Sequence, residues 1–119
     1  MELRTSDQWM NMVFSLPCWR GQGKFKTMCK NIKKYVEHDF YFEGNQPNTQ
    51  AYDIIWILMK KYYTVESKPM NQKELRKSLG MRTGTRNRKN YEKFRDKVIN
   101  IYENFDGYST NTNVRFTQN

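Results

Sequence analysis

The stretch KPMNQKELRKSLGMRTGTRNRKNYEKFRDK, residues 68–97, carries the pattern on which the predicted fold rests. It contains eleven Lys or Arg residues against three acids, a net charge of +8 within a chain whose total is +9. The same stretch has the signals of a short helix, a glycine-containing turn and a long amphipathic helix. Positive charge gathered on a compact helical frame favours a polyanionic partner.

Two helices are predicted in this region. Asn71 stands three residues before Glu74, the spacing of an Asn-led capping box, and Gly80 stands where a C-terminal glycine belongs. The first helix is therefore expected over 71–79, and the second from Thr85 to Phe105. The apolar positions of the second helix recur at helical spacing and should face the core; they are Tyr91, Phe94, Val98, Ile101, Tyr102 and Phe105.

The charged residues of the second helix gather on one side. At 100° per residue, four cations fall within about 80° of one another, opposite the apolar positions: Arg86, Lys89, Lys93 and Lys97. Arg88 flanks the apolar positions, and Asn87 and Asn90 lie in the same first two turns. The helix is thus expected to present a basic face.

A buried helix is expected before this basic region. From Ala51 to Tyr63 the apolar residues point nearly all round a helix, which predicts burial on every side at the centre of the core. Asn48 or Thr49 is expected to cap it, with Asp53 in its first turn at the positive end of the helix dipole. A buried strand through Ile54–Leu58 is the alternative, although the length of the apolar run favours a helix.

The N-terminal third is also predicted to be helical. Thr5 and Gln8 have capping-box spacing at the start of a short helix that Pro17 ends. A second, amphipathic helix is expected from Lys24 to about Phe40, with apolar residues on one side and lysines on the other.

Length and composition fit one folded domain. The 119 residues include 15% aromatics, enough apolar surface to offset the conformational entropy lost on folding. A turn cluster at 43–48 marks a division within that domain. We therefore expect a single domain over 1–119, made of an N-terminal helical extension, 1–47, and a core, 48–119.

Neither a membrane-spanning run nor a signal peptide is apparent, so the cytoplasm is the expected location, or the host cytoplasm for a phage protein. Cys18 and Cys29 are then expected to be free thiols. With His38 they are too few for a closed zinc site, so no metal and no cofactor is predicted. His38 has no paired nucleophile, and no glycine-rich phosphate loop or small-molecule substrate is evident, so no enzymatic activity is expected.

Together these elements resemble a winged helix–turn–helix, with 51–63, 71–79 and 85–105 as its first, second and recognition helices. The weakly alternating segment Tyr108–Gln118 would supply the wing, as a short β-hairpin or strand. The expected fold class is therefore mainly α, with three helices, a C-terminal β element and the N-terminal helical extension. The resemblance covers about Asn48 to Asn119 and rests on pattern and charge. A recognition helix of this length is long for the class.

The resemblance implies that the start of the last helix enters the major groove of duplex DNA. Arg and Lys match guanine edges there, and Asn matches adenine. The residues expected at or beside the groove are Arg82, Thr83, Thr85, Arg86, Asn87, Arg88, Lys89, Asn90 and Lys93, with Lys97 extending the basic face. Those expected on phosphates are Lys73, Arg76, Lys77 and, from the wing, Arg115.

We therefore expect a sequence-specific double-stranded DNA-binding protein, either a transcriptional repressor or regulator or a site-recognition factor. Its small size and Asn-, Lys- and Tyr-rich composition suit a phage or another mobile element. Because small modules bind weakly, a homodimer is expected through the N-terminal helices around Trp9, Phe14 and Trp19. The alternative is a small interaction or inhibitor protein whose basic face binds an acidic or nucleic-acid-handling protein.

Overall fold

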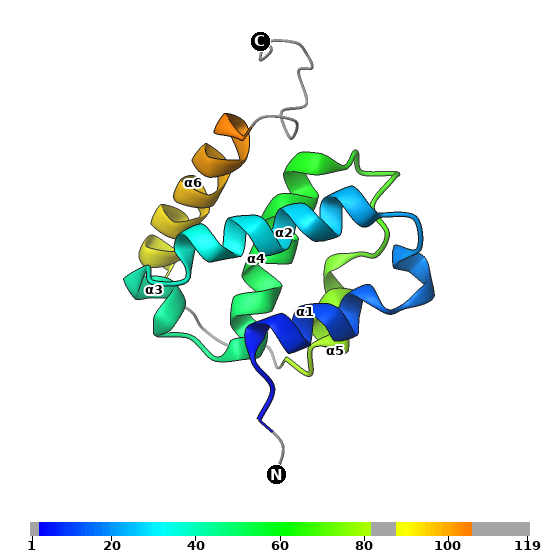
Figure 1. The fold of residues 1–119 in the computed structure, drawn as a ribbon, viewed down its shortest axis with the longest axis horizontal. Helices are drawn as coiled ribbons and strands as arrows, with labels where there is room; N and C mark the ends of the chain where they lie inside the picture. The colour runs from blue at the N-terminus through cyan, green and yellow to red at the C-terminus, as the bar shows by residue number, and fades with distance from the viewer. Residues whose placement is uncertain (1–2, 82–87, 106–119) are drawn as a thin grey trace.

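The computed structural model describes residues 3–81 and 88–105. These residues form six α-helices and one short 3-10 helix, and Figure 1 shows their arrangement. In chain order they are α1 (Ser6–Phe14), η1 (Pro17–Trp19), α2 (Gly23–Val36), α3 (Phe40–Glu43), α4 (Pro47–Tyr62), α5 (Gln72–Ser78) and α6 (Arg88–Asn104). The mainly helical prediction is confirmed.

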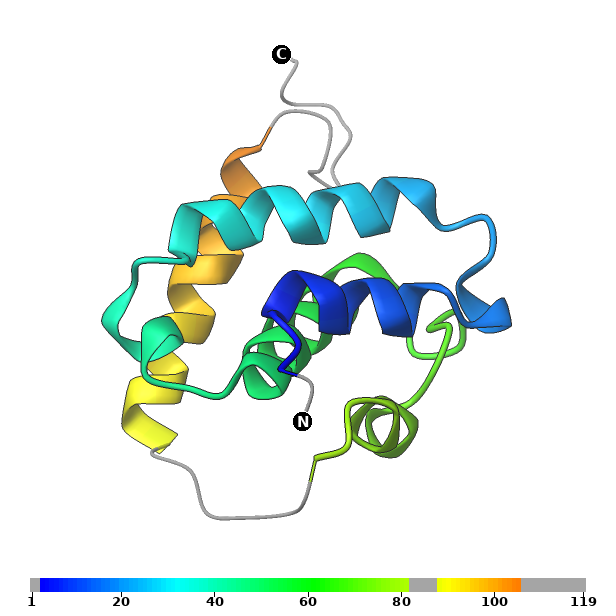
Figure 2. The same ribbon diagram turned by 60° about the horizontal axis from the view of Figure 1, so that its bottom comes forward.

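Helix α4 lies at the centre of the fold, with α1, α2, α5 and α6 packed around it (Figure 2). Eight of its residues are buried, as the apolar pattern predicted, and the alternative of a strand through Ile54–Leu58 is excluded. The core draws side chains from Met10 near the N-terminus to Tyr102 near the end of α6. The N-terminal helices therefore share one hydrophobic core with α4, α5 and α6.

The predicted start of α4 was wrong. The helix begins at Pro47 and its N-cap is Gln46, since the fixed φ of proline suits the first helical position. Asn48 instead donates from Nδ2 to the carbonyl oxygen of Leu79 at 3.0 Å, which joins the start of α4 to the end of α5. Asp53 consequently lies beyond the first turn, where it is buried and accepts a 3.0 Å hydrogen bond from the Tyr41 hydroxyl.

The N-terminal helices form largely as predicted. The Thr5–Gln8 capping box is present, and Pro17 opens η1 after α1 has ended. Helix α2, however, stops at Val36 instead of continuing to Phe40. Asp39 ends the run, because its side chain accepts from the backbone N–H of Tyr41 at 2.9 Å and caps the separate helix α3.

Helix α5 has a complete cap at each end. Asn71 and Glu74 form the predicted capping box. At the other end Gly80 adopts a φ of +63°, and its N–H donates to the carbonyl of Lys77. The Met81 N–H donates to the carbonyl of Arg76, so the helix ends in a Schellman motif. The predicted role of Gly80 as the C-terminal capping glycine of this helix is confirmed.

An aromatic cluster joins the N-terminal helices to the core. Trp19 stacks on Phe25 with ring centroids 5.4 Å apart, and Phe14 packs edge-on against both rings. Phe14 and Trp19 are buried and Trp9 is half-buried. Two of the three rings expected at a dimer surface, those of Phe14 and Trp19, therefore pack inside the chain. A homodimer through the N-terminal helices stays a prediction.

Within residues 3–81 and 88–105 no strand is present. The wing predicted at Tyr108–Gln118 and the predicted helix start at Thr85 fall outside the described residues. No helix in the described part of the chain is both long and apolar enough to cross a membrane.

Candidate nucleic-acid interface

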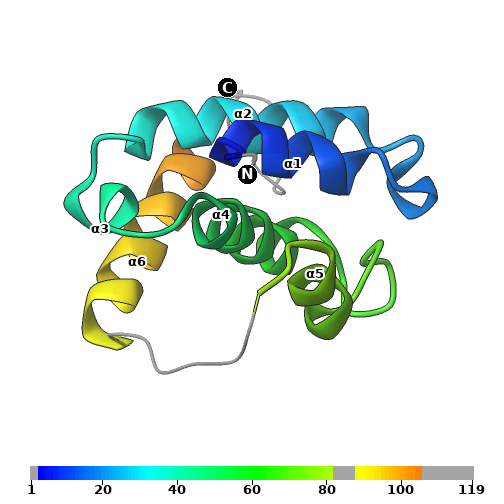
Figure 3. The same cartoon turned by 90° about the horizontal axis from the view of Figure 1, so that it is seen from below.

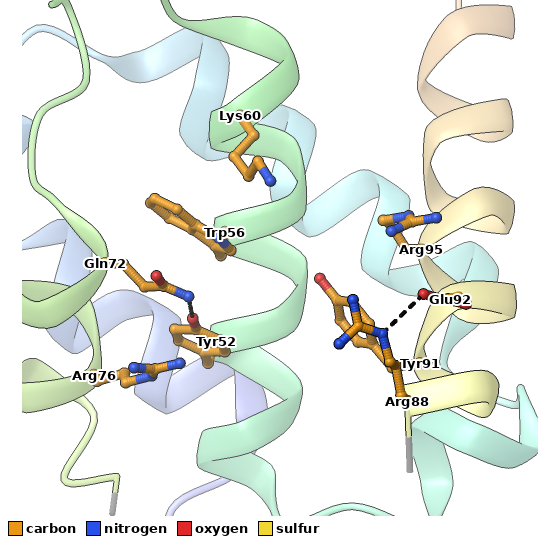
Figure 4. A pocket seen from close by; sticks show the side chains of 9 residues that line it. All are labelled: Tyr52, Trp56, Lys60, Gln72, Arg76, Arg88, Tyr91, Glu92 and Arg95. Carbon is orange, nitrogen blue, oxygen red and sulfur yellow. Dashed lines mark hydrogen bonds and ion pairs between the residues drawn. The ribbon is translucent and has the colours of Figure 1, made fainter. Parts of the chain in front are cut away.

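Helices α5 and α6 lie on opposite sides of α4 (Figure 3), and an open groove of about 380 Å³ runs between them. We call it the α5–α6 groove. Helix α4 forms its floor, and Figure 4 shows the side chains that line it. They are Tyr52, Trp56 and Lys60 from α4, Gln72 and Arg76 from α5, and Arg88, Tyr91, Glu92 and Arg95 from α6.

The helical period explains why these residues meet. Tyr52, Trp56 and Lys60 stand at i, i+4 and i+8 of α4, so they share one face of the helix. Gln72 and Arg76 follow the same spacing on α5. The α6 residues stand at i, i+3, i+4 and i+7 from Arg88. Three helices therefore each turn one stripe of polar and aromatic side chains toward the groove.

The groove is strongly basic. Four cationic side chains line it against a single carboxylate, that of Glu92. Glu92 accepts from Arg88 Nε at 3.3 Å, and Arg95 pairs at 3.2 Å with Asp96, which is not among the lining residues. Lys60 and Arg76 form no ion pair with a described residue. Like charges brought together repel, so the groove favours an anionic ligand.

Tyr52, on the floor of the groove, holds two side chains of α5 in place. Its hydroxyl accepts a 2.6 Å hydrogen bond from Gln72 Nε2, and the guanidinium carbon of Arg76 lies 5.6 Å from its ring centroid. The tyrosine is buried, so both α5 side chains are held against a rigid surface. The α5 wall is therefore preorganised.

Exposed lysines lie on both of the helices that wall the groove, outside its lining. Lys73 and Lys77 stand one turn apart on α5, and Lys89 and Lys93 stand one turn apart on α6. None of the four forms an ion pair with a described residue, whereas Lys33 of α2 pairs with both Asp7 and Glu37. We call these four residues the rim lysines; none of them lines the groove itself, and Lys93 lies on the side of α6 that faces α3.

The structure brings some predicted site residues together and separates others. Arg76, expected on a phosphate, and Arg88, expected on a base, line the same groove from opposite walls. Asn90, Lys93 and Lys97 instead line a second hollow beside α3, on another side of α6. Lys73, Lys77 and Lys89 are exposed on α5 and α6 and line neither hollow. The other predicted site residues lie outside the described ones; they are Arg82, Thr83, Thr85, Arg86, Asn87 and Arg115.

Lys97, a predicted DNA-binding residue, is paired with a carboxylate of the same chain. Its ammonium donates to Asp39 Oδ2 at 2.9 Å, which joins α6 to the N-cap of α3. Partial burial alone raises the pKa of Asp39, but the bond from Lys97 and that from the Tyr41 N–H outweigh it. The pKa of Asp39 is therefore lowered, and the Asp39–Lys97 pair holds α6 against α3.

Sequence reasoning missed Trp56, Lys60 and Arg95 as groove residues. Trp56 was expected to be buried with the rest of α4, and Lys60 lies outside the basic stretch that begins at residue 68. The available signal was the spacing of Tyr52, Trp56 and Lys60, which places a lysine on the same helix face as two aromatic rings. That stripe is typical of a partly exposed face.

Among the described residues, no three His, Cys, Asp or Glu side chains gather in a way that could hold a metal ion. The chain matches no protein-family model, and no curated protein or solved structure is significantly similar to it.

Proposed function

We propose that this protein binds double-stranded DNA through the surface formed by α5 and α6. The observation that carries the proposal is the gathering of positive charge there: the four rim lysines, which form no ion pair with a described residue, and the basic α5–α6 groove, with four cationic side chains against one carboxylate. Duplex DNA is a polyanion of dense and regular charge, and release of its counterions drives binding by such surfaces.

The length and diameter of α6 favour duplex DNA as the ligand over a polyanion of irregular shape. A 17-residue helix is about 25 Å long at 1.5 Å per residue, and its diameter fits the major groove. Its apolar side packs on the core through Phe94, Val98 and Tyr102, while Lys89 and Lys93 face solvent. The helix is therefore held rigidly by one side and presents the other, as a recognition helix does.

Specific recognition is proposed for the first turn of α6. Arg88 has an exposed side chain, so its guanidinium can reach a base edge after exchanging Glu92 for guanine. Asn90 lies in the same turn. Site-specific control of transcription, or site recognition by a phage or mobile element, is the corresponding biological role, and the winged helix–turn–helix is the corresponding mode of docking.

Two double variants test the proposal: one removes two rim lysines, and its control removes two lysines outside the proposed surface. Lys89→Ala/Lys93→Ala removes two charges from α6, and Lys24→Ala/Lys34→Ala removes two exposed charges from α2, which lies on the other side of α4 (Figure 3). All four lysines are in helices, so the change in helix propensity is matched. Circular dichroism and thermal melts check that both variants fold.

Binding to a mixed-sequence duplex is then measured by fluorescence anisotropy over a salt series. The α6 variant should lose about 1.8 from the log–log salt slope, at about 0.9 per phosphate contact, and the α2 variant should keep the wild-type slope. Equal losses in the two variants would show that net charge alone drives binding. Absence of binding by the folded wild type would favour the protein-partner alternative.

A further inference from the structure

The residue that the duplex-binding surface leaves unexplained is Trp56. Of the residues of α4 from Ala51 to Met59, all except Trp56 are buried. Trp56 is partly exposed, and its side chain lines the α5–α6 groove (Figure 4). Exposing a tryptophan forgoes hydrophobic stabilisation that burial would give. Trp and Arg side chains together are also typical of the energetic centre of a binding site.

The surroundings of Trp56 are those of a nucleotide site. Lys60 stands one turn further along α4, Arg76 lines one wall and Arg95 lines the other. Tyr91 adds a second partly exposed ring from the α6 wall. An indole offers a flat face on which any base can stack, and the cations can hold the attached phosphates.

The size and rigidity of the groove also suit the binding of a single nucleotide. Its volume of about 380 Å³ lies within the range of small-molecule sites, roughly 300–1,000 Å³. Gln72 and Arg76 are already held against Tyr52, so the α5 wall needs little ordering when a ligand enters.

We propose that the α5–α6 groove binds an unpaired nucleotide of the bound DNA, with its base stacked on Trp56 and its phosphates held by Arg76, Arg95 and Lys60. The inference rests on the proposed function, because the rim lysines of α5 and α6, the two helices that wall the groove, would hold the DNA at this surface. A base that is mismatched, bulged or single-stranded can enter this groove, whereas a base in an intact duplex stays within the stack.

The expected consequence is a preference for DNA with an unpaired base. Stacking of one base on an aromatic side chain corresponds to about a five- to 150-fold gain in affinity. Part of that gain is spent on ordering the nucleotide, so we expect a duplex with a single-nucleotide bulge to bind about five- to 50-fold more tightly than the paired duplex.

The test compares the paired duplex with the bulged duplex by anisotropy, for the wild type, Trp56→Leu and Trp56→Phe. The wild type should prefer the bulge, Trp56→Leu should bind both duplexes equally, and Trp56→Phe should keep part of the preference because it retains a ring for stacking. A wild type that binds both duplexes equally, or a Trp56→Leu protein that keeps the full preference, would overturn the inference.

Tryptophan fluorescence gives a second readout that needs no destabilising variant. The bulged duplex should quench wild-type emission more than the paired duplex, and Trp56→Phe should abolish that difference, since Trp9 and Trp19 lie outside the groove. Quenching by deoxyadenosine monophosphate without any preference for the bulge would assign the groove to free nucleotides and overturn the DNA inference. Failure of the wild type to bind either duplex would refute the proposed function itself.

Discussion

Lys97 of α6 donates to Asp39, the N-cap of α3, across 2.9 Å and 58 positions of the chain. The Asp39 carboxylate therefore makes two interactions: one oxygen pairs with Lys97, and the other accepts a hydrogen bond from the Tyr41 N–H and caps α3. Through this pair the corner between α2 and α3 is tied to the helix that carries the proposed DNA-binding residues.

Because of the Asp39–Lys97 pair, the free energy of unfolding should fall as the solution becomes acidic. The pKa of Asp39 is lowered in the folded protein from its ordinary 3.8, so its contribution is complete above that value and is lost as pH falls through the lowered pKa. Asp39→Asn keeps a capping oxygen, removes the charge and should cost about 0.2–1 kcal/mol at neutral pH.

The measurement is urea unfolding from pH 7 to pH 2. The difference between the wild type and Asp39→Asn should shrink as pH falls from about 4 through the lowered pKa of Asp39, below which both side chains are uncharged. Lys97→Met should remove the same part of the stability, and the double variant should add little to either change. A constant difference at every pH would contradict the role given to the pair.

Gly80 and Gly23 should respond in opposite directions to the same substitution. Gly80→Ala forces a side chain into a φ of +63° and should cost about 1 kcal/mol, although the added Cβ would meet only Trp9 at 3.9 Å. Gly23→Ala places alanine at the open first position of α2 and should stabilise by about 0.4–1 kcal/mol. Thermal melts of both variants test the helix ends, and destabilisation by Gly23→Ala would show that α2 starts elsewhere.

Tyr102 carries a buried hydroxyl with no hydrogen-bond partner among the described residues. Burial, with smaller effects from Tyr62 and Glu103, raises its pKa to about 12. Its contribution to stability is therefore complete below pH 10 and is lost as pH rises toward 12. Tyr102→Phe should stabilise the protein by about 1 kcal/mol at pH 7 and lose less stability than the wild type between pH 10 and 12. A destabilised phenylalanine variant would mean that the hydroxyl is bonded in solution.

The two cysteines should differ in reactivity. Cys18 is exposed, while Cys29 is fully buried in α2, where burial raises the pKa of its thiol. Titration with a thiol reagent should give one reactive group in the native protein and two in denaturant. Two fast-reacting groups under native conditions would show that α2 opens readily.

The sequence predicted the elements that local chemistry specifies. The capping boxes at Thr5 and Asn71, the glycine at position 80 and the apolar periodicity of α6 all rest on spacing within one helix, and each is present. What spacing could not give was the pairing of side chains from distant helices. Asp39 reaching Lys97 and Arg76 reaching Tyr52 depend on how α3 and α5 pack, which no local pattern records.

The candidate site was predicted in composition but not in shape. The basic residues of α5 and α6 were expected, yet the two helices pack on opposite sides of α4 and leave a groove floored by Trp56. An all-round apolar pattern predicts burial on average and cannot show which single position a neighbouring helix fails to cover. Trp56 was missed for that reason.

The central claim is that the rim lysines bind the phosphates of duplex DNA, and its most direct test is the salt dependence of binding by the wild-type protein. Anisotropy with a mixed-sequence duplex from about 50 to 200 mM salt should give a log–log slope of about −3.6 or steeper, at about −0.9 for each of the four lysines. A slope near zero, or no binding at the lowest salt, would contradict the claim.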